Sequence, residues 1–309
     1  MNVLITGSSG QIGTNVGLAL LDRGDTVLGV DIRPNNWTDR IETVSTDLSR
    51  SGSADLPTGA SFDMVLHFAA HAKVYELVEH PERAMENIAM SFAMIEYCRR
   101  NELPLIFSSS REVYGDIHRH VTDEPSADFV VAESPYSASK IAGEAMIYAY
   151  AQCYDLPYLV FRFSNVYGRY DNDLGRMERV IPLFMDLIAR DQPLTLFGKE
   201  KVLDFTYVDD CVRGVVAGID ALMERRVVGQ TVNLAYGEGS TLVDLINILA
   251  LGLGKEPKVT YEPARHGEVT RYVADIEKAR DLLGYSPQVP FTEGLIRALK
   301  WARSTGAIP

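Results

Sequence analysis

Cysteine is scarce in this chain of 309 residues, and its few occurrences are widely separated. The three cysteines, Cys98, Cys153 and Cys211, form no CxxC pair and no His/Cys cluster. This excludes a disulfide-stapled secreted scaffold and a zinc-finger type of site. We therefore expect buried free thiols in a reducing compartment, the cytoplasm, and no metal ion.

The chain also has fewer positive than negative charges and no long apolar run. The chain has 30 Lys and Arg against 42 Asp and Glu, a net charge of −12, which argues against nucleic acid or an anionic membrane as main partner. No apolar run approaches the roughly 20 residues that span a bilayer. The opening MNVLITGSSG lacks the basic start and apolar core of a signal peptide, so we expect none.

What is present is an alternation of short apolar runs with longer helical patterns. The runs lie at 3–6, 26–31, 64–70, 105–110 and 158–164, and the helical patterns at about 13–22, 81–100 and 137–154. Near-continuous apolar strands separated by helices are typical of a parallel sheet covered on both faces. We predict an α/β fold with a doubly wound sheet over residues 1–165. The proline-punctuated residues 166–309 predict a smaller lobe, partly interleaved with the first.

The stretch GSSGQIG, residues 7–13, follows the first predicted strand and opens the first helix. Gly7, Gly10 and Gly13 provide the tight turn, the close backbone approach and the helix–strand contact that a dinucleotide pyrophosphate needs. The free N–H groups and the positive dipole end of a helix N-terminus favour phosphate. The first half of the chain is therefore predicted to be Rossmann-like.

An acidic residue ends the second predicted strand. Asp31 stands about 20 residues after the glycines, which is the spacing of a carboxylate that accepts both ribose hydroxyls and repels a 2′-phosphate. This favours NAD over NADP. Arg33, two residues on, is the counter-argument, because a guanidinium can accept a 2′-phosphate.

The segment SPYSASK places Tyr136 and Lys140 four residues apart at the start of a predicted helix. Side chains at this spacing lie on one helix face. A phenol has a reference pKa of about 10 and is a poor base, but a neighbouring ammonium group stabilises its phenolate. The pair can then take a proton from a hydroxyl while hydride leaves the same carbon.

Taken together, these motifs resemble the extended short-chain dehydrogenase/reductases that act on nucleotide sugars, including the UDP-glucose 4-epimerases, dehydratases and decarboxylases. The resemblance covers nearly the whole chain. It rests on GSSGQIG, Asp31, TDL (46–48), HFAA (67–70), SSSREVYG (108–115), YSASK (136–140), RFSNVYG (162–168), DFTYVDD (204–210) and RHGEVTRYVADIEKARDLLGYSP (265–287).

The resemblance implies NAD as the cofactor, a nucleotide sugar as the substrate, a UDP-sugar first, and a nucleotide-sugar-binding role for the smaller lobe. It implies that the cofactor is bound by Gly7, Gly10, Gln11, Ile12, Gly13, Asp31, Asp47, Leu48, Phe68, Ala69, Ala70, Ser108, Tyr136, Lys140 and Phe163. It also implies that Asn165 contacts the nucleotide-sugar phosphates and that Val180 borders the base pocket. Arg265 is implied to clamp the diphosphate, for which a planar bidentate donor is suited. The family usually has an arginine where this chain has Leu203, so either diphosphate binding leans on Arg265 or the substrate differs from the usual one.

The segment SSSREVYG carries the reaction-specific residues. By the resemblance, Ser110 is the catalytic hydroxyl that holds the sugar O4, and Glu112 stands where dehydratases and decarboxylases carry a second base. Arg111 replaces the acidic residue that many dehydratases pair with that glutamate. An arginine does not lose its proton and so cannot act as a general acid. It can bind a substrate carboxylate or form an ion pair with Glu112.

These motifs are compatible with three alternative functions. The first is an NAD-dependent nucleotide-sugar 4-epimerase that works through a transient 4-keto intermediate, with Ser110, Tyr136 and Lys140 as its catalytic set. The second is a dehydratase or decarboxylase that also uses Glu112. The third is a non-catalytic protein that binds NAD as a sensor, for which a complete proton relay would have no use.

A homodimer is the expected assembly. Family members usually pair two helices from each subunit, here those at about 83–100 and 137–153. Met94, Ile95, Ile147 and Tyr150 extend the apolar character of these helices beyond a single stripe. A helix that is apolar on more than one face needs a second partner.

Overall fold

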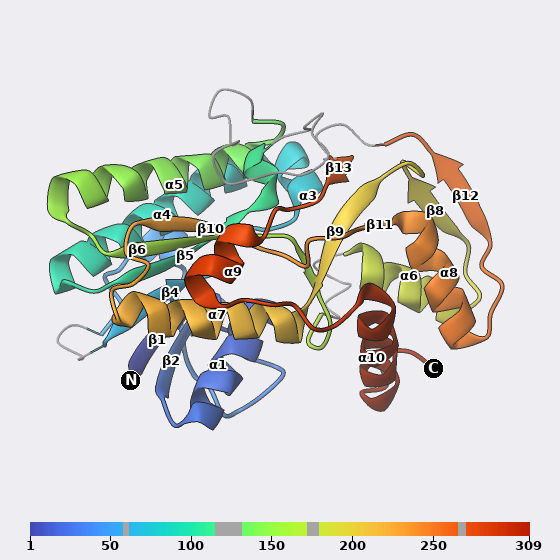
Figure 1. Ribbon diagram of the computed structural model, residues 1–309, viewed down its shortest axis with the longest axis horizontal. Helices are drawn as coiled ribbons and strands as arrows, with labels where there is room; N and C mark the ends of the chain where they lie inside the picture. The colour runs from blue at the N-terminus through green and yellow to red at the C-terminus, as the bar shows by residue number, and fades with distance from the viewer. Residues whose placement is uncertain (58–61, 115–131, 172–178, 265–269) are drawn as a thin grey trace.

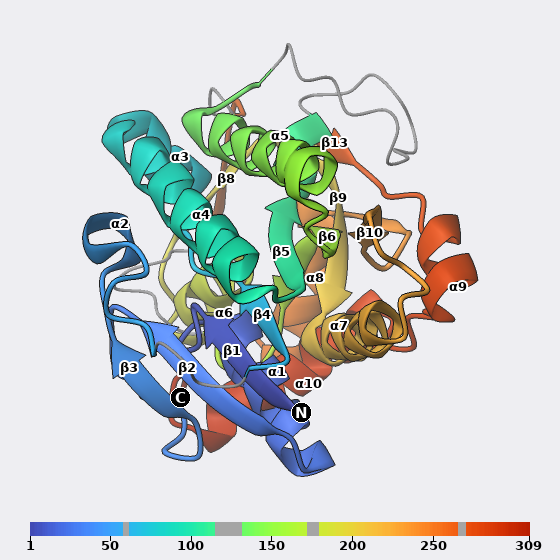
Figure 2. The ribbon, with the colours of Figure 1, turned by 90° about the vertical axis from the view of Figure 1, so that its left-hand side faces the viewer.

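A computed structural model describes residues 1–57, 62–114, 132–171, 179–264 and 270–309. Its centre is a seven-stranded sheet in the order β10-β6-β5-β4-β1-β2-β3 (Figures 1 and 2). Every neighbouring pair in this sheet is parallel. The strands are β1 (Asn2–Thr6), β2 (Thr26–Asp31), β3 (Glu42–Ser45), β4 (Met64–His67), β5 (Leu105–Ser110), β6 (Tyr158–Phe163) and β10 (Gln230–Leu234).

Helices cover both faces of this sheet, as Figure 1 shows. One face carries α4 (Glu82–Asn101) and α5 (Pro135–Tyr154), which pack against each other, and the other carries α1 (Gln11–Arg23) and α7 (Val208–Met223). Because both faces are covered, β5 and β6 are buried along their whole length. This explains why the two strands are almost free of alternation between apolar and polar residues. Three short helical segments, α2 (Leu48–Ser51), α3 (Val74–Glu79) and η1 (Arg111–Tyr114), follow strand ends.

The second half of the chain builds a smaller lobe and also returns to the first. Its strands are β7 (Asn165–Tyr167), β9 (Val202–Tyr207), β11 (Gly239–Thr241) and β13 (Arg271–Tyr272) in one sheet, and β8 (Leu194–Phe197) and β12 (Val259–Glu262) in another. Its helices are α6 (Val180–Ala189), α8 (Leu242–Leu253), α9 (Glu277–Leu283) and α10 (Phe291–Ser304). The strand β10 and the helix α7 come from this half yet belong to the large sheet and its cover.

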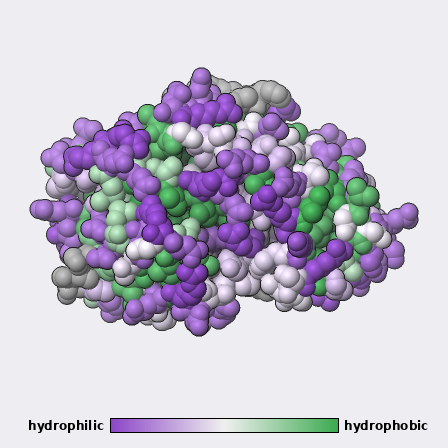
Figure 3. Space-filling view, turned by 60° about the horizontal axis from the view of Figure 1, so that its bottom comes forward, coloured by the Kyte–Doolittle hydropathy of each residue, from purple (hydrophilic) through white to green (hydrophobic). Residues whose placement is uncertain are grey.

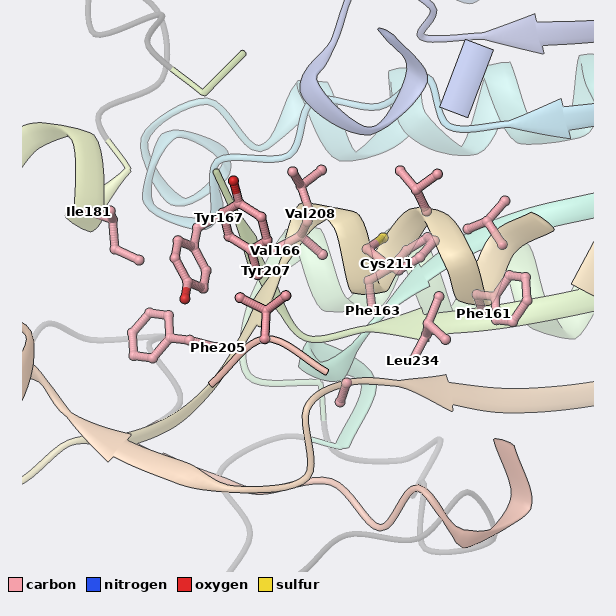
Figure 4. Packing of buried hydrophobic residues seen from close by; sticks show 14 of the residues in the cluster. Phe161, Phe163, Val166, Tyr167, Ile181, Phe205, Tyr207, Val208, Cys211 and Leu234 are labelled. Carbon is pink, nitrogen blue, oxygen red and sulfur yellow. The ribbon is translucent and has the colours of Figure 1, made fainter. Parts of the chain in front are cut away.

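One hydrophobic cluster runs from the large sheet into the smaller lobe (Figure 4). Phe161 and Phe163 of β6 lie at one end, and Tyr167, Phe205 and Ile181 lie toward the other. The Phe205 ring stacks on Phe291 of α10 with ring centroids 4.9 Å apart. The shared core joins the lobes into a single packed unit, which fixes the walls of the space between them.

The outer face over α1, α7 and α10 is largely hydrophilic with small apolar patches between (Figure 3). Within the described ranges, no helix is long and apolar enough to cross a membrane. Nor do the described residues include a group of three or more His, Cys, Asp or Glu side chains that could hold a metal ion.

Several expectations from the sequence needed correction. The strands β3 and β10 were not anticipated, because each is short and only partly apolar. Cys98 and Cys211 are buried, but Cys153 is exposed, so the expectation of buried thiols was wrong at that position. Met94, Ile95 and Ile147 are fully buried, so they fill the monomer's own core.

Candidate active site

A cavity of about 680 Å³ opens at the carboxyl ends of the parallel strands. Ligands in open α/β sheets bind in this position. Its lining includes every site residue predicted from the sequence, except Arg265, which lies outside the described residues. The lining members of the predicted set are Gly7, Gly10, Gln11, Ile12, Gly13, Asp31, Asp47, Leu48, Phe68, Ala69, Ala70, Ser108, Ser110, Arg111, Glu112, Tyr136, Lys140, Phe163, Asn165 and Val180.

The glycine loop has no room for a side chain at Gly7 or Gly13. Gly7 has φ +73°, and a Cβ there would stand 2.7 Å from the backbone nitrogen of Ala69. A Cβ on Gly13 would lie 2.2 Å from the Gly7 carbonyl oxygen. The glycines thus allow the turn, the neighbouring strand and the start of α1 to pack tightly, leaving backbone N–H groups at the cavity. This geometry fits a dinucleotide pyrophosphate.

Asp31 is held in place by the same loop. Its Oδ2 accepts the Ser9 N–H at 3.0 Å and its Oδ1 accepts the Arg33 N–H at 3.1 Å. The Arg33 Nε also lies 3.9 Å from Asp31 Oδ1. The carboxylate is therefore fixed at the cavity wall, and the nearby arginine faces it.

The next strand ends supply the far walls of the cavity. Asp47 Oδ1 accepts the Ser49 N–H at 3.0 Å and caps the short helix α2. Asp47 thus has a structural role alongside its predicted contact with the cofactor. Phe68 packs edge-on against Phe163, with ring centroids 6.3 Å apart, and this links the ends of β4 and β6 across the cavity.

The helix that carries Tyr136 and Lys140 is tightly capped. The Ser134 hydroxyl accepts a hydrogen bond from the Ser137 N–H, and the Ser137 hydroxyl accepts one from the Ser134 N–H. These two bonds make a reciprocal capping box. Pro135 occupies the first turn, where its missing N–H costs nothing. The helix therefore begins two residues earlier than the sequence pattern indicated, and Tyr136 sits within its first turn.

Lys140 is buried beneath Tyr136. Its Nζ donates to the Ser108 carbonyl at 2.7 Å and lies 5.8 Å from the centre of the Tyr136 ring. Burial lowers the pKa of Lys140 to about 8, and the charge of Glu144 opposes this shift. The ammonium group is thus fixed close to the phenol that it is predicted to assist.

Burial also raises the pKa of Tyr136 to about 12, while its hydrogen bond with Ser110 lowers it. The charge of Glu112 raises this pKa further, and the charges of Arg179 and Arg111 lower it. In the protein alone Tyr136 is therefore a phenol at neutral pH. An added positive charge in the cavity would be needed to favour the phenolate.

Arg111 and Glu112 begin η1, immediately after Ser110. The Arg111 Nη2 lies 2.9 Å from Glu112 Oε1, and the two side chains are 12% and 5% exposed. The Glu112 N–H donates to Ser110 Oγ at 3.2 Å. The adjacent charges predicted from the sequence therefore form a nearly buried ion pair at the cavity.

A second buried ion pair lies behind α5, the helix that carries Tyr136 and Lys140, and was not predicted. Glu144 of α5 accepts two hydrogen bonds from Arg162 of β6, at 3.0 and 2.7 Å. The same carboxylate accepts hydrogen bonds from the hydroxyls of Ser109 and Tyr148. Glu144 therefore ties the helix carrying Lys140 to the strand end next to Ser110. The sequence did contain a signal for this pair, because Arg162 is a charged residue inside the apolar run YLVFRF.

The smaller lobe closes the other side of the cavity. Asn165 Nδ2 donates to the Asp204 carbonyl at 2.9 Å, while Val180 begins α6. Arg179, just before α6, donates to Gln11 Oε1 at 2.6 Å and lies 3.3 Å from Asp171. Arg179 was not predicted, and it joins the glycine loop to the smaller lobe.

Comparisons with known proteins agree on one family. The sequence pattern of the NAD dependent epimerase/dehydratase family matches residues 3–235. The chain is 28% identical to an uncharacterized UDP-glucose epimerase, YtcB, of Bacillus subtilis, over 98% of each chain. Its structure is similar to the UDP-glucose 4-epimerase of Thermotoga maritima with UDP-glucose, with 29% identity, a TM-score of 0.89 and 99% of each chain covered. It is also similar to the UDP-glucuronic acid 4-epimerase of Bacillus cereus in complex with UDP-glucuronic acid and NAD, with 27% identity, a TM-score of 0.86, and 99% and 100% of the two chains covered.

Proposed function

This chain belongs to the NAD-dependent epimerase/dehydratase family, and from that premise we propose that it is a UDP-sugar 4-epimerase. Such an enzyme inverts the configuration at C4 through a transient 4-keto sugar, with no net oxidation. The observation that carries the proposal is the convergence of Ser110, Tyr136 and Lys140 on the cavity that the glycine loop and Asp31 also line. The relatives and solved structures named above are UDP-sugar epimerases, which supports the same reaction.

The side chains have distinct parts in the proposed reaction. Tyr136 is the base that takes the proton from the sugar O4, and Ser110 holds that oxygen while the proton moves. Lys140 stays beside the phenol and stabilises its anionic form. Bound NAD would supply a positively charged ring that favours the phenolate and takes up and returns hydride at C4. Burial of Tyr136 and Lys140 keeps water from competing for the proton.

We assign cofactor binding to the glycine loop, Asp31, Asp47 and the strand ends around Phe68. On the substrate side we assign the nucleotide to Asn165 and Val180. Arg179 is added because its guanidinium lies between the glycine loop and α6. Leu203 is buried and does not line the cavity. Positively charged side chains at other positions must therefore bind the diphosphate.

The experiment that tests the proposal is incubation with a panel of UDP-sugars, read by mass and by product stereochemistry. We expect a product of unchanged mass and inverted C4, with no free NADH released. Loss of water would indicate a dehydratase and loss of carbon dioxide a decarboxylase. NAD binding without any turnover would indicate a sensor, and each of these three results would contradict the proposal.

Replacement of Asp31 tests the cofactor assignment. We expect Asp31→Ala to weaken NAD binding at least about tenfold, because a charged acceptor of the ribose hydroxyls is lost. Binding of NADP should weaken less, since the variant no longer repels a 2′-phosphate. Titration calorimetry with both cofactors measures the two effects. Asp39→Ala, at an exposed carboxylate in the segment between β2 and β3, is the matched control. A preference for NADP in the unmodified protein would assign the choice to Arg33 instead.

We also propose a homodimer formed through α4 and α5. Three of the four residues that first motivated a dimer, Met94, Ile95 and Ile147, lie in the core, but Met85 and Phe92 of α4 are 65% and 47% exposed. They are seven residues apart, so they share one helix face. Large exposed apolar side chains that lie together mark interaction sites.

Light scattering tests this assembly. At micromolar concentration the unmodified protein should have twice the subunit mass, and the double variant Met85→Lys/Phe92→Lys should have the mass of one subunit. Leu251→Lys, at a residue of α8 that is 86% exposed, should remain dimeric. A monomeric unmodified protein would refute the proposed dimer.

The cytoplasm is the compartment that we propose. Its support is the state of the thiols, since Cys98, Cys153 and Cys211 are all unpaired. Disulfides are the rule for thiols in oxidising compartments.

A further inference from the structure

The Arg111–Glu112 ion pair lies beside the groups that would hold the reacting carbon. Both residues line the cavity directly after Ser110. The Glu112 N–H is bonded to the Ser110 hydroxyl. Glu112 and Arg111 are also close enough to Tyr136 for their charges to act on its phenol. A substrate whose O4 contacts Ser110 and Tyr136 therefore presents the neighbouring part of its ring to this pair.

The guanidinium of Arg111 is held in one orientation. One nitrogen contacts Glu112 at 2.9 Å, and the group lies over the Tyr272 ring, 5.7 Å from its centre. The other terminal nitrogen, Nη1, is buried and has no hydrogen-bond partner among the described residues. A buried donor without an acceptor is costly, and a substrate oxygen would satisfy it.

The pair therefore offers a donor and an acceptor side by side. A hydroxyl group suits both, because it accepts from Arg111 and donates to Glu112. A carboxylate can only accept, and it would enter next to the charge of Glu112, which is 5% exposed. Like charges placed close together in a poorly solvated site repel strongly.

The substituents next to O4 on a hexose ring are the C3 hydroxyl and the C6 group. C6 is the position at which UDP-glucose and UDP-glucuronic acid differ, the first having a hydroxymethyl and the second a carboxylate. Solved structures similar to this chain contain each of these ligands, so the family likeness leaves the choice open.

We propose that Arg111 and Glu112 together are the specificity determinants for C6, and that they select UDP-hexoses with a neutral hydroxymethyl group over UDP-hexuronates. The inference rests on the proposed 4-epimerase function. The buried ion pair acts as one unit, with the guanidinium fixing the carboxylate and the carboxylate excluding a second negative charge.

The test compares kcat/KM for UDP-glucose and UDP-glucuronic acid in three proteins. The unmodified protein should favour UDP-glucose by at least about 30-fold. Glu112→Gln removes the repelling charge and leaves Arg111 to bind a carboxylate, so the ratio should shift at least about tenfold toward UDP-glucuronic acid. Arg111→Gln removes the guanidinium that contacts Glu112 and leaves the repelling carboxylate in place, so the ratio should shift in the opposite direction.

Opposite shifts distinguish selection from a structural role, because a structural defect lowers turnover of both sugars alike. Glu293→Gln breaks an exposed Arg–Glu pair on α10 and should leave the ratio unchanged. A preference of the unmodified protein for UDP-glucuronic acid would overturn this inference but not the proposed 4-epimerase function. That measurement is informative even if neither variant folds. Parallel losses for both sugars in the two variants would also overturn the inference. Absence of turnover with every UDP-sugar would overturn the proposed function, and the inference with it.

Discussion

Tyr136→Phe should lower kcat at least about 100-fold, which is the smaller end of the range for general acid–base catalysis. The substitution removes only the hydroxyl, the group that the proposed mechanism uses to take the O4 proton. The ring remains at the start of a helix with a complete capping box, so folding should be preserved. NAD binding should also be nearly unchanged, because the glycine loop and Asp31 are untouched.

The measurement is steady-state conversion of the best UDP-sugar, together with titration of NAD and a thermal unfolding curve. Tyr150→Phe is the matched control, since Tyr150 lies on the same helix and its hydroxyl donates to Glu96, away from the cavity. That variant should retain turnover within about twofold, as expected for a surface substitution away from the site. Near-normal turnover of Tyr136→Phe would remove Tyr136 from the mechanism.

Arg162→Met should destabilise the protein by about 3–5 kcal/mol, the cost of leaving one member of a buried ion pair without its partner. Arg162 and Glu144 have side chains that are 4% and 1% exposed. Burial alone would lower the pKa of Arg162, but its hydrogen bonds to Glu144 and the charge of that carboxylate raise it. Without Arg162, Glu144 must keep an unpaired charge in the core or take up a proton.

Denaturant unfolding measures this effect, with two companion variants. Arg190→Met breaks an exposed pair with Asp186, one helical turn away, and should cost less than about 1 kcal/mol. The double variant Arg162→Met/Glu144→Gln should recover part of the lost stability, because the buried charge is removed as well. Equal destabilisation by Arg162→Met and Arg190→Met would show that the buried pair contributes no more than a surface pair.

Much of the cofactor half could be inferred from local sequence. GSSGQIG is informative because a tight turn at a helix start tolerates only glycine at certain positions, whatever the rest of the fold. Asp31 ends a strand at a fixed distance from that turn. Tyr136 and Lys140 share a helix face because of the helical repeat alone. The glycine turn and the Tyr136–Lys140 pair are each set within one turn or helix, and Asp31 follows from the length of one strand–helix–strand unit.

Relations across the sheet could not be inferred in the same way. The pairing of Glu144 with Arg162 joins a helix to a strand 18 residues later, and Arg179 meets Gln11 across 168 residues. The burial of Met94 and Ile95 depends on how α4 packs on the sheet, so apolar residues on several faces did not by themselves locate an interface. The adjacency of Arg111 and Glu112 was visible in the sequence, but their burial beside Ser110 follows from the packing of β5 between its neighbours. Hydrophobic periodicity and turn chemistry are local, whereas burial, charge pairing and the shape of a cavity depend on contacts between segments distant in the chain.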